Sequence, residues 1–248
     1  MRSTLYHRGV VHSRTDPFAQ ALLVVDGQVA WLGPQDSVHA VLDGADEVVD
    51  LDGALVTPGF VDAHAHVLET GFALVGLDLS AATSLPDLLD AVARAARHDR
   101  ASGTADPLLG HGWDETAWVE GRTPTREELD RAAQGAPVHL ERVDGHGAVV
   151  STAFADLAGL GGLPGWRADG WVTGAAHRAA RATARRAGPT RRETLHRRAL
   201  LAAAAAGIVS LHEHGSPDRD PGGPTDLLSL TRDPADGLPG VVAHWSQP

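Results

Sequence analysis

The residues best placed for chemistry in this sequence are two histidines, His64 and His66, that follow an apolar stretch. They end the run Thr-Pro-Gly-Phe-Val-Asp-Ala-His-Ala-His at residues 57–66. Side chains two positions apart in a β-strand project to the same side, so both imidazoles can bind one metal ion where the strand ends. Asp62 could orient one imidazole by accepting a hydrogen bond from it. The run therefore predicts a strand that ends in two metal ligands.

A second group of possible ligands stands at His212, Glu213 and His214, at the end of an apolar stretch. Imidazole and carboxylate groups both bind zinc well. On a regular strand the two histidines face one side and Glu213 the other, so the three cannot converge on one ion without a bend. For Glu213 we therefore expect a position beside the metal ligands or a role in packing.

The overall composition is that of a globular protein, with 43% hydrophobic and 21% charged residues and no apolar run long enough for a transmembrane helix. A net charge of −11 argues against nucleic acid as a partner. The absence of cysteine excludes disulfides and thiolate metal sites. The N-terminus lacks the apolar core of a signal peptide, so we expect a cytoplasmic protein that does not bind membranes. All basic residues are arginine, which excludes a carboxylated lysine as a metal bridge.

The order of apolar and turn-forming segments predicts an α/β fold in two parts. Residues 1–53 contain candidate strands at 5–11, 21–25, 28–32 and 47–51, with Asp26-Gly27 as a hairpin turn between the middle two. Strands and helices alternate over residues 54–248, which favours a parallel sheet. The candidate strands there are 107–113, 137–143, 208–213 and 241–245, besides the strand that ends at His66. The candidate helices are 85–98, 125–133 and a helix or helix pair over 173–206, whose arginines, including Arg181 and Arg185, we expect on a solvated face.

Four blocks in order along the chain carry a family resemblance. Residues 57–66 resemble the first barrel strand of the metal-dependent amidohydrolase superfamily. Three further blocks resemble those of its amidohydrolase-3 group, which includes YtcJ-like proteins and N-substituted formamide deformylases. These are Gly-His-Gly-Trp-Asp with Pro-Thr-Arg-Glu-Glu-Leu-Asp, then Arg-Val-Asp-Gly-His, then Gly-Ile-Val-Ser-Leu-His-Glu-His-Gly. The match identifies a group but no substrate.

The resemblance implies a small N-terminal β-module followed by a TIM-like (β/α)8 barrel. Such a barrel has eight strands, and the sequence offers only about five, so we expect it to be incomplete. Members of the group are roughly twice as long, and the blocks of their second half are absent here. The resemblance thus implies the N-terminal half of a hydrolase that cleaves carbon–nitrogen bonds in small amides or formamides. The cofactor it implies is one or two divalent ions, most readily zinc, and its general base would lie beyond Pro248.

The resemblance also suggests which residues contact the substrate. His146 ends a candidate strand, where barrel enzymes collect catalytic groups, and it either contacts substrate or is a structural histidine. Asp144 would hold His146 or cap the following helix. Trp113 and Asp114 either line the substrate pocket or pack a loop over it.

Two functions stay open at this point. The first is a metal-dependent hydrolase of a small molecule, or its N-terminal half, with the remaining site residues beyond Pro248; a complementing C-terminal chain and a homo-oligomer are possible partners. The second is a catalytically inactive module of the same fold that binds a ligand or a partner chain.

Overall fold

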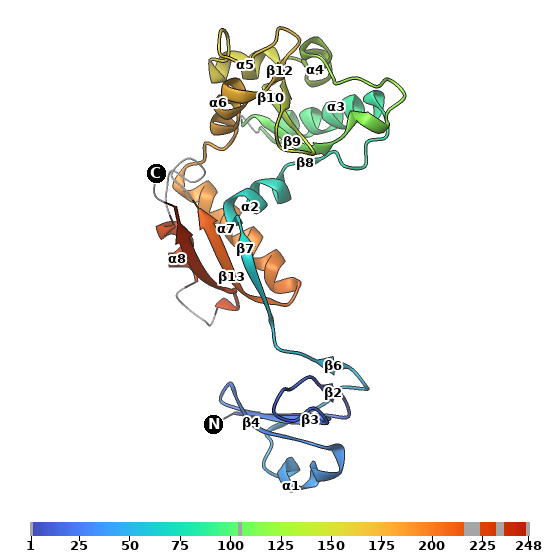
Figure 1. Cartoon of the computed structure of the whole chain (residues 1–248), viewed down its shortest axis with the longest axis vertical. Coiled ribbons are helices and arrows are strands. Elements are labelled where there is room, and N and C mark those ends of the chain that lie inside the picture. Colours follow the sequence, from blue (N-terminus) through green and yellow to red (C-terminus); the bar gives the residue numbers. More distant parts are fainter. Residues whose placement is uncertain (1, 104–105, 216–223, 232–235, 247–248) are drawn as a thin grey trace. The chain divides into compact units, whose positions relative to one another are not determined.

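The computed structural model describes residues 2–103, 106–215, 224–231 and 236–246 (Figure 1). It separates into two compact units, Met1–Phe60 and Val61–Pro248. Among the helices that the structure describes, none combines the length and apolarity needed to cross a bilayer.

The first unit is built on a four-stranded sheet in the order β4-β3-β1-β5. Its strands are β1 (Ser3–His7), β3 (Ala21–Val25), β4 (Gln28–Gly33) and β5 (Glu47–Asp50). A short parallel pair, β2 (Val10–Val11) with β6 (Leu55–Val56), and the helical turns Gln35–Ser37 and α1 (His39–Leu42) complete the unit. Asp26 and Gly27 both have positive φ, 48° and 80°, as a tight two-residue hairpin requires, and this confirms the predicted turn. The predicted strand 5–11 is interrupted at Arg8, whose φ of 58° breaks the extended backbone.

The second unit contains a mixed five-stranded sheet in the order β12-β11-β10-β9-β8. Its strands are β8 (Leu77–Asp78), β9 (Leu108–Trp113), β10 (Val138–Arg142), β11 (Ala148–Val150) and β12 (Trp171–Val172). Strands β8, β9 and β10 are parallel, whereas β11 is antiparallel to both of its neighbours. The helices of this segment are α3 (Leu85–Ser102), α4 (Arg126–Ala133), α5 (Thr152–Ala158) and α6 (Gly174–Ala184). The predicted capping box opens α4, where Thr125 and Glu128 exchange hydrogen bonds.

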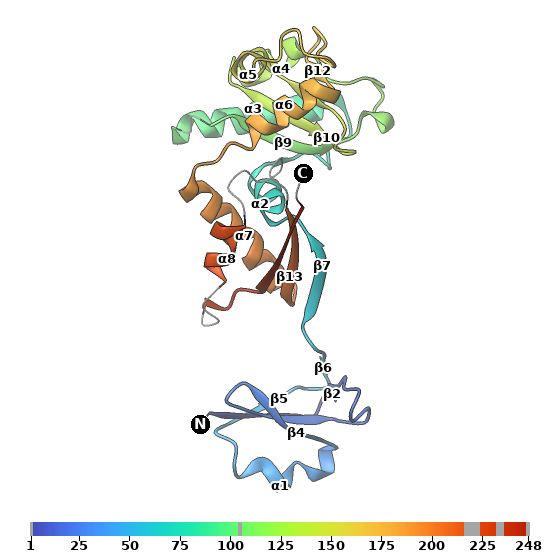
Figure 2. The ribbon, with the colours of Figure 1, turned by 60° about the vertical axis from the view of Figure 1, so that its left-hand side comes forward.

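A separate three-stranded sheet of the second unit carries the histidine pair. Its order is β14-β13-β7, with β7 (Phe60–Ala65), β13 (Ile208–Gly215) and β14 (Gly240–Trp245). Helices α2 (Val67–Val75), α7 (Pro189–Ala205) and α8 (Thr225–Leu230) accompany it. Leu211 of β13 packs with Leu200 of α7 and Leu227 of α8, so one face of this sheet is covered by helices (Figures 1 and 2).

This division corrects the expectation that about five strands follow one another in a single parallel sheet. Strand β7 pairs with β13 and not with β8, and β10 is followed by an antiparallel partner. The physical reason is the turn after β10, where Gly145 takes a φ of 67° and its N–H donates to the carbonyl of Arg142. The chain reverses there, whereas a barrel would need a crossover helix. The helical region 173–206 is a pair, α6 and α7, as one of the two expectations had it.

Candidate metal centre

His64 and His66 lie at the end of β7, where the strand passes into helix α2. His64 belongs to the strand, and His66 is the residue that precedes the first turn of α2. Their rings meet edge to face, with centroids 5.1 Å apart. Thr70 donates hydrogen bonds from its N–H and its hydroxyl to the carbonyl of His66, at 2.9 and 3.0 Å. The strand end and the helix start therefore fix both histidines.

Asp62 lies two residues before His64 on the same strand. Its carboxylate accepts a hydrogen bond from the backbone N–H of His64 at 3.1 Å. The contact that the structure shows is thus with the backbone of the candidate ligand and not with an imidazole.

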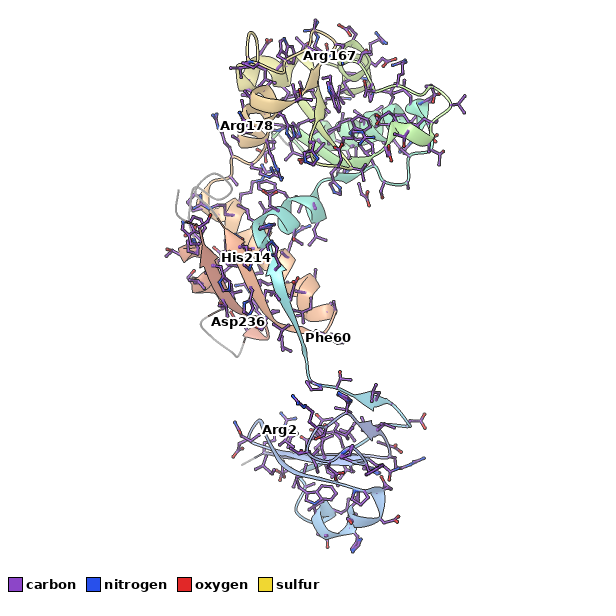
Figure 3. The ribbon with its side chains drawn as sticks, viewed as in Figure 1. Arg2, Phe60, Arg167, Arg178, His214 and Asp236 are labelled. Carbon is purple, nitrogen blue, oxygen red and sulfur yellow. The ribbon has the colours of Figure 1, made fainter. Side chains whose placement is uncertain are left out.

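The neighbouring strands bring three further histidines to the same sheet face. His214 lies on β13 (Figure 3). It stacks on His64, with ring centroids 4.2 Å apart, and its Nε2 lies 3.3 Å from the carbonyl oxygen of Ala63. His244 of β14 lies opposite His214 in the strand register and stacks on it at 4.6 Å. Nδ1 of His212 lies within hydrogen-bond distance, 2.9 Å, of Nε2 of His244. Four imidazoles from three strands therefore form one column.

Glu213 points to the opposite face of β13, as the alternation of side chains predicts. It is 9% exposed, and its Oε2 accepts a hydrogen bond of 2.5 Å from the N–H of Val67 at the start of α2. Its Oε1 lies 4.0 Å from Nδ1 of His66. One buried carboxylate therefore contacts both the helix start and the candidate ligand that precedes it.

An open pocket of about 520 Å³ lies over these groups. Its lining consists of His64, His66, His214, Gly215, His244, Trp245 and Ser246. The donor type suits a divalent ion such as zinc, because neutral imidazoles are common zinc ligands. The number of donors is incomplete: within the described ranges no group of three or more His, Cys, Asp or Glu side chains is arranged to hold an ion.

The other predicted site residues lie elsewhere, in the five-stranded sheet and its loops. Trp113 is fully buried and donates from Nε1 to the carbonyl of Leu140. Asp114 accepts from Thr116, and this hydrogen bond lowers the pKa of its carboxyl. His146 stands in the turn between β10 and β11, where its N–H donates to Asp144. None of Trp113, Asp114 and His146 lines the pocket.

Sequence reasoning missed His244 as a site residue. It is a single histidine in an apolar strand, without a spacing motif of its own. Only the parallel register of β13 with β14, which sets His244 opposite His214, brings it to the pocket.

Comparison with known proteins places these features in a family. The model of the amidohydrolase family matches residues 47–225. The amidohydrolase YtcJ of Bacillus subtilis is 31% identical over 159 residues, which are 63% of this chain and 30% of that protein. An N-substituted formamide deformylase of Arthrobacter pascens is 33% identical over 145 residues, 58% of this chain and 26% of that enzyme.

Solved structures share the fold. A crystal structure of an uncharacterized metal-dependent hydrolase from Pyrococcus horikoshii superimposes with a TM-score of 0.74 at 24% identity, over 98% of this chain and 48% of that one. A metal-dependent hydrolase from Pyrococcus furiosus gives a TM-score of 0.73, also at 24% identity, over 98% of this chain and 50% of that one. The chain thus spans about half the length of the solved structures that it matches.

Proposed function

Because the chain belongs to the amidohydrolase family, we propose that it carries the metal-binding part of a hydrolase of carbon–nitrogen bonds other than peptide bonds. The observation that supports this most directly is the His64–His66 pair at a strand end, with the buried Glu213 beside His66. Small amides or formamides are the proposed substrates. The match to an N-substituted formamide deformylase supports that class.

In this proposal His64 and His66 bind the divalent ion, which we take to be zinc. Such an ion, when bound, polarises a substrate carbonyl and lowers the pKa of water. Glu213 anchors Val67, the residue after His66, and lies 4.0 Å from Nδ1 of the His66 ring, and Asp62 holds the backbone of His64. His214 and His244 form the adjoining wall of the pocket.

We further propose that β7, β13 and β14 are consecutive strands of a (β/α)8 barrel. Their order and the parallel β13–α8–β14 crossover support this, since such units build barrels. The other strands, the remaining metal ligands and the general base would come from residues beyond Pro248, or from a complementing C-terminal polypeptide or an oligomer. The proposed setting is cytoplasmic.

A second candidate is a catalytically inactive module that binds a ligand or a partner chain. The incomplete donor set of the described residues favours it. The two functions differ in one measurable respect, because only the hydrolase gains activity when the missing ligands are supplied.

Zinc binding tests the site itself. We expect the double variant His64→Ala with His66→Ala to bind zinc at least about tenfold more weakly than the unaltered chain. His98→Ala, which removes an exposed histidine of α3, is the matched control and should bind as before. The same pair of substitutions in a full-length relative should abolish its stoichiometric metal. Unchanged metal content there would refute the assignment.

Activity tests the need for a complementing half. We expect the chain alone, with added zinc, to show no turnover of N-substituted formamides or acylated amines above background. Co-expression with the C-terminal half of a relative should restore turnover if the hydrolase proposal is correct. Turnover by the chain alone that a chelator and His64→Ala both abolish would show that the donor set is complete without a partner.

A further inference from the structure

A charged cluster of the second unit lies apart from the histidine pocket, where β10, α6 and α2 meet. It surrounds a cavity of about 80 Å³. The cavity's charged and imidazole side chains are Glu69, His111, His139, Glu141, Arg181 and Arg185. The role proposed above for the metal ligands uses none of them.

Glu141 is the centre of this cluster. Its Oε1 lies 3.7 Å from Nε2 of His177 and 3.7 Å from Nε of Arg181, and its Oε2 lies 3.6 Å from Arg185. Burial acts to raise the pKa of Glu141, but the contact with His177 and the charge of Arg181 outweigh it and lower that pKa. The nearby His139 has its pKa lowered to about 4 by burial. Glu141 is therefore an anion at neutral pH, beside a neutral His139.

Two arginines join Glu141 to a second carboxylate. Arg185 forms a close ion pair with Glu69 of α2, and Arg181 lies 3.8 Å from the same group. The side chains of Arg185 and Glu69 are only 17% and 19% exposed, so solvent screens their attraction less than it would at the surface. Arg185 thus links a residue of α2 to a residue of β10.

Glu69 stands in the first turn of α2, three residues after His66. The same short helix is held at two further points. Val67 donates to Glu213, and Gly71 packs so closely on α7 that a Cβ there would lie 2.5 Å from the carbonyl oxygen of Leu195. The placement of His66 therefore depends on how firmly this turn is held.

We propose that Arg185 is a positioning residue for the metal site: by joining Glu69 to Glu141 it holds the first turn of α2, and with it His66, in the geometry that binds the ion. This inference rests on the proposed function, because it requires His66 to be a ligand. Arg185 would thus have a function in the metal site, although its sequence pattern alone indicates a solvated helix face.

The test compares Arg185→Gln with Arg178→Gln. Arg178 lies within α6, whose C-cap residue is Arg185; it is exposed and forms none of the ion pairs found among the described residues (Figure 3). Two quantities are measured on the whole chain: the zinc dissociation constant, by competition with a chromophoric chelator, and the hydrogen exchange of the α2 amides. We expect Arg185→Gln to weaken zinc binding about tenfold and to speed α2 exchange, and Arg178→Gln to change neither.

Each other outcome also decides the question. Zinc binding within about twofold of the unaltered chain in Arg185→Gln would overturn the positioning role, even if α2 exchanged faster, because the cluster would then be structural only. If Arg185→Gln fails to fold, Glu69→Gln removes the same ion pair from the α2 side, and zinc binding as tight as in the unaltered chain would equally overturn the positioning role. Equal zinc binding by the unaltered chain and by the His64→Ala, His66→Ala double variant would instead refute the metal site, and the positioning role with it.

Discussion

Glu213 provides the sharpest test of how the candidate site is built, because one buried carboxylate contacts two parts of it. The perturbation is Glu213→Ala, compared with Glu213→Gln. The alanine leaves the N–H of Val67, a residue that is 1% exposed, without its acceptor. An unsatisfied buried donor costs about 1–3 kcal/mol. Loss of a negative charge at a helix N-terminus adds about 0.3–1 kcal/mol.

We therefore expect Glu213→Ala to lower the free energy of unfolding by about 2–3 kcal/mol. Glu213→Gln keeps an oxygen acceptor and loses only the charge, so it should cost about 1 kcal/mol. Urea unfolding followed by circular dichroism measures both values, and hydrogen exchange of α2 shows whether the loss is local. The control is Glu193→Ala, an exposed carboxylate of α7, which should change stability by no more than about 0.5 kcal/mol.

The same variants test the orientation of His66. Because Glu213 holds the N–H of Val67, the residue after His66, and its Oε1 lies 4.0 Å from Nδ1 of His66, loss of the carboxylate should weaken zinc binding about tenfold. A Glu213→Ala chain as stable as the Glu193→Ala control, with unaltered zinc affinity, would refute the reasoning. Equal losses in Glu213→Ala and Glu213→Gln would show that the charge matters and the hydrogen bond does not.

Three further predictions concern the scaffold. Ser151→Ala should cost about 2 kcal/mol in urea unfolding, because the buried hydroxyl accepts from the N–H of Val138 at 2.8 Å and also caps α5; a cost under about 0.5 kcal/mol contradicts this. Hydrogen bonds from Arg122 lower the pKa of Glu128 from 4.5 to about 2. The ionised Glu128 therefore stabilises the folded chain by about 1–2 kcal/mol above pH 4.5, and this contribution is lost as the pH falls from 4.5 toward 2. In Glu128→Gln the free energy of unfolding should no longer fall over this pH range. Size-exclusion chromatography of the chain alone should show oligomers or aggregate, since each outer strand of the sheet β14-β13-β7 has only one neighbour among the described strands, and a monodisperse monomer with one cooperative melt would refute this.

The features that the sequence predicts well are those fixed by a few adjacent residues. The Asp26-Gly27 turn and the Thr125–Glu128 capping box depend on local backbone geometry, and both are present. The proximity of His64 and His66, whose ring centroids lie 5.1 Å apart, follows from the same kind of local geometry, and their role as metal ligands stays a proposal. Features of this kind, which depend on a few neighbouring residues, can be predicted without knowledge of the tertiary fold.

The assignment of strands to sheets was not predictable in the same way. Alternating strands and helices look alike whether they build one sheet or two. The pairing of β7 with β13 joins segments separated by the whole five-stranded sheet, and no local signal marks it. The sequence shows a glycine at position 145, but it does not show that the chain reverses there and that the parallel strands end at β10.

Long-range contacts also determine which partners the arginine side chains of the α6 region have. Arg181 and Arg185 have the spacing of a solvated helix face, but the side chain of Arg185 is only 17% exposed, and that of Arg181, which is 38% exposed, also contacts carboxylates. The carboxylates that they contact come from β10 and α2, far away in sequence, and only the packing of α6 against those elements brings them together. The place of His244 in the pocket wall depends in the same way on strand register.

Strand β13 shows how one short segment can both support and line a site. Glu213 faces the helix side, where it holds the start of α2 and contacts His66, while His214 lines the pocket and His212 contacts His244 of the pocket wall. Because side chains alternate along a strand, a register shift of one residue would turn the carboxylate into the pocket and press both imidazoles against the apolar helices. The α2 anchor and the histidine wall would then be lost together. The register of β13 against β7 and β14 is therefore the feature on which the proposed metal centre depends most.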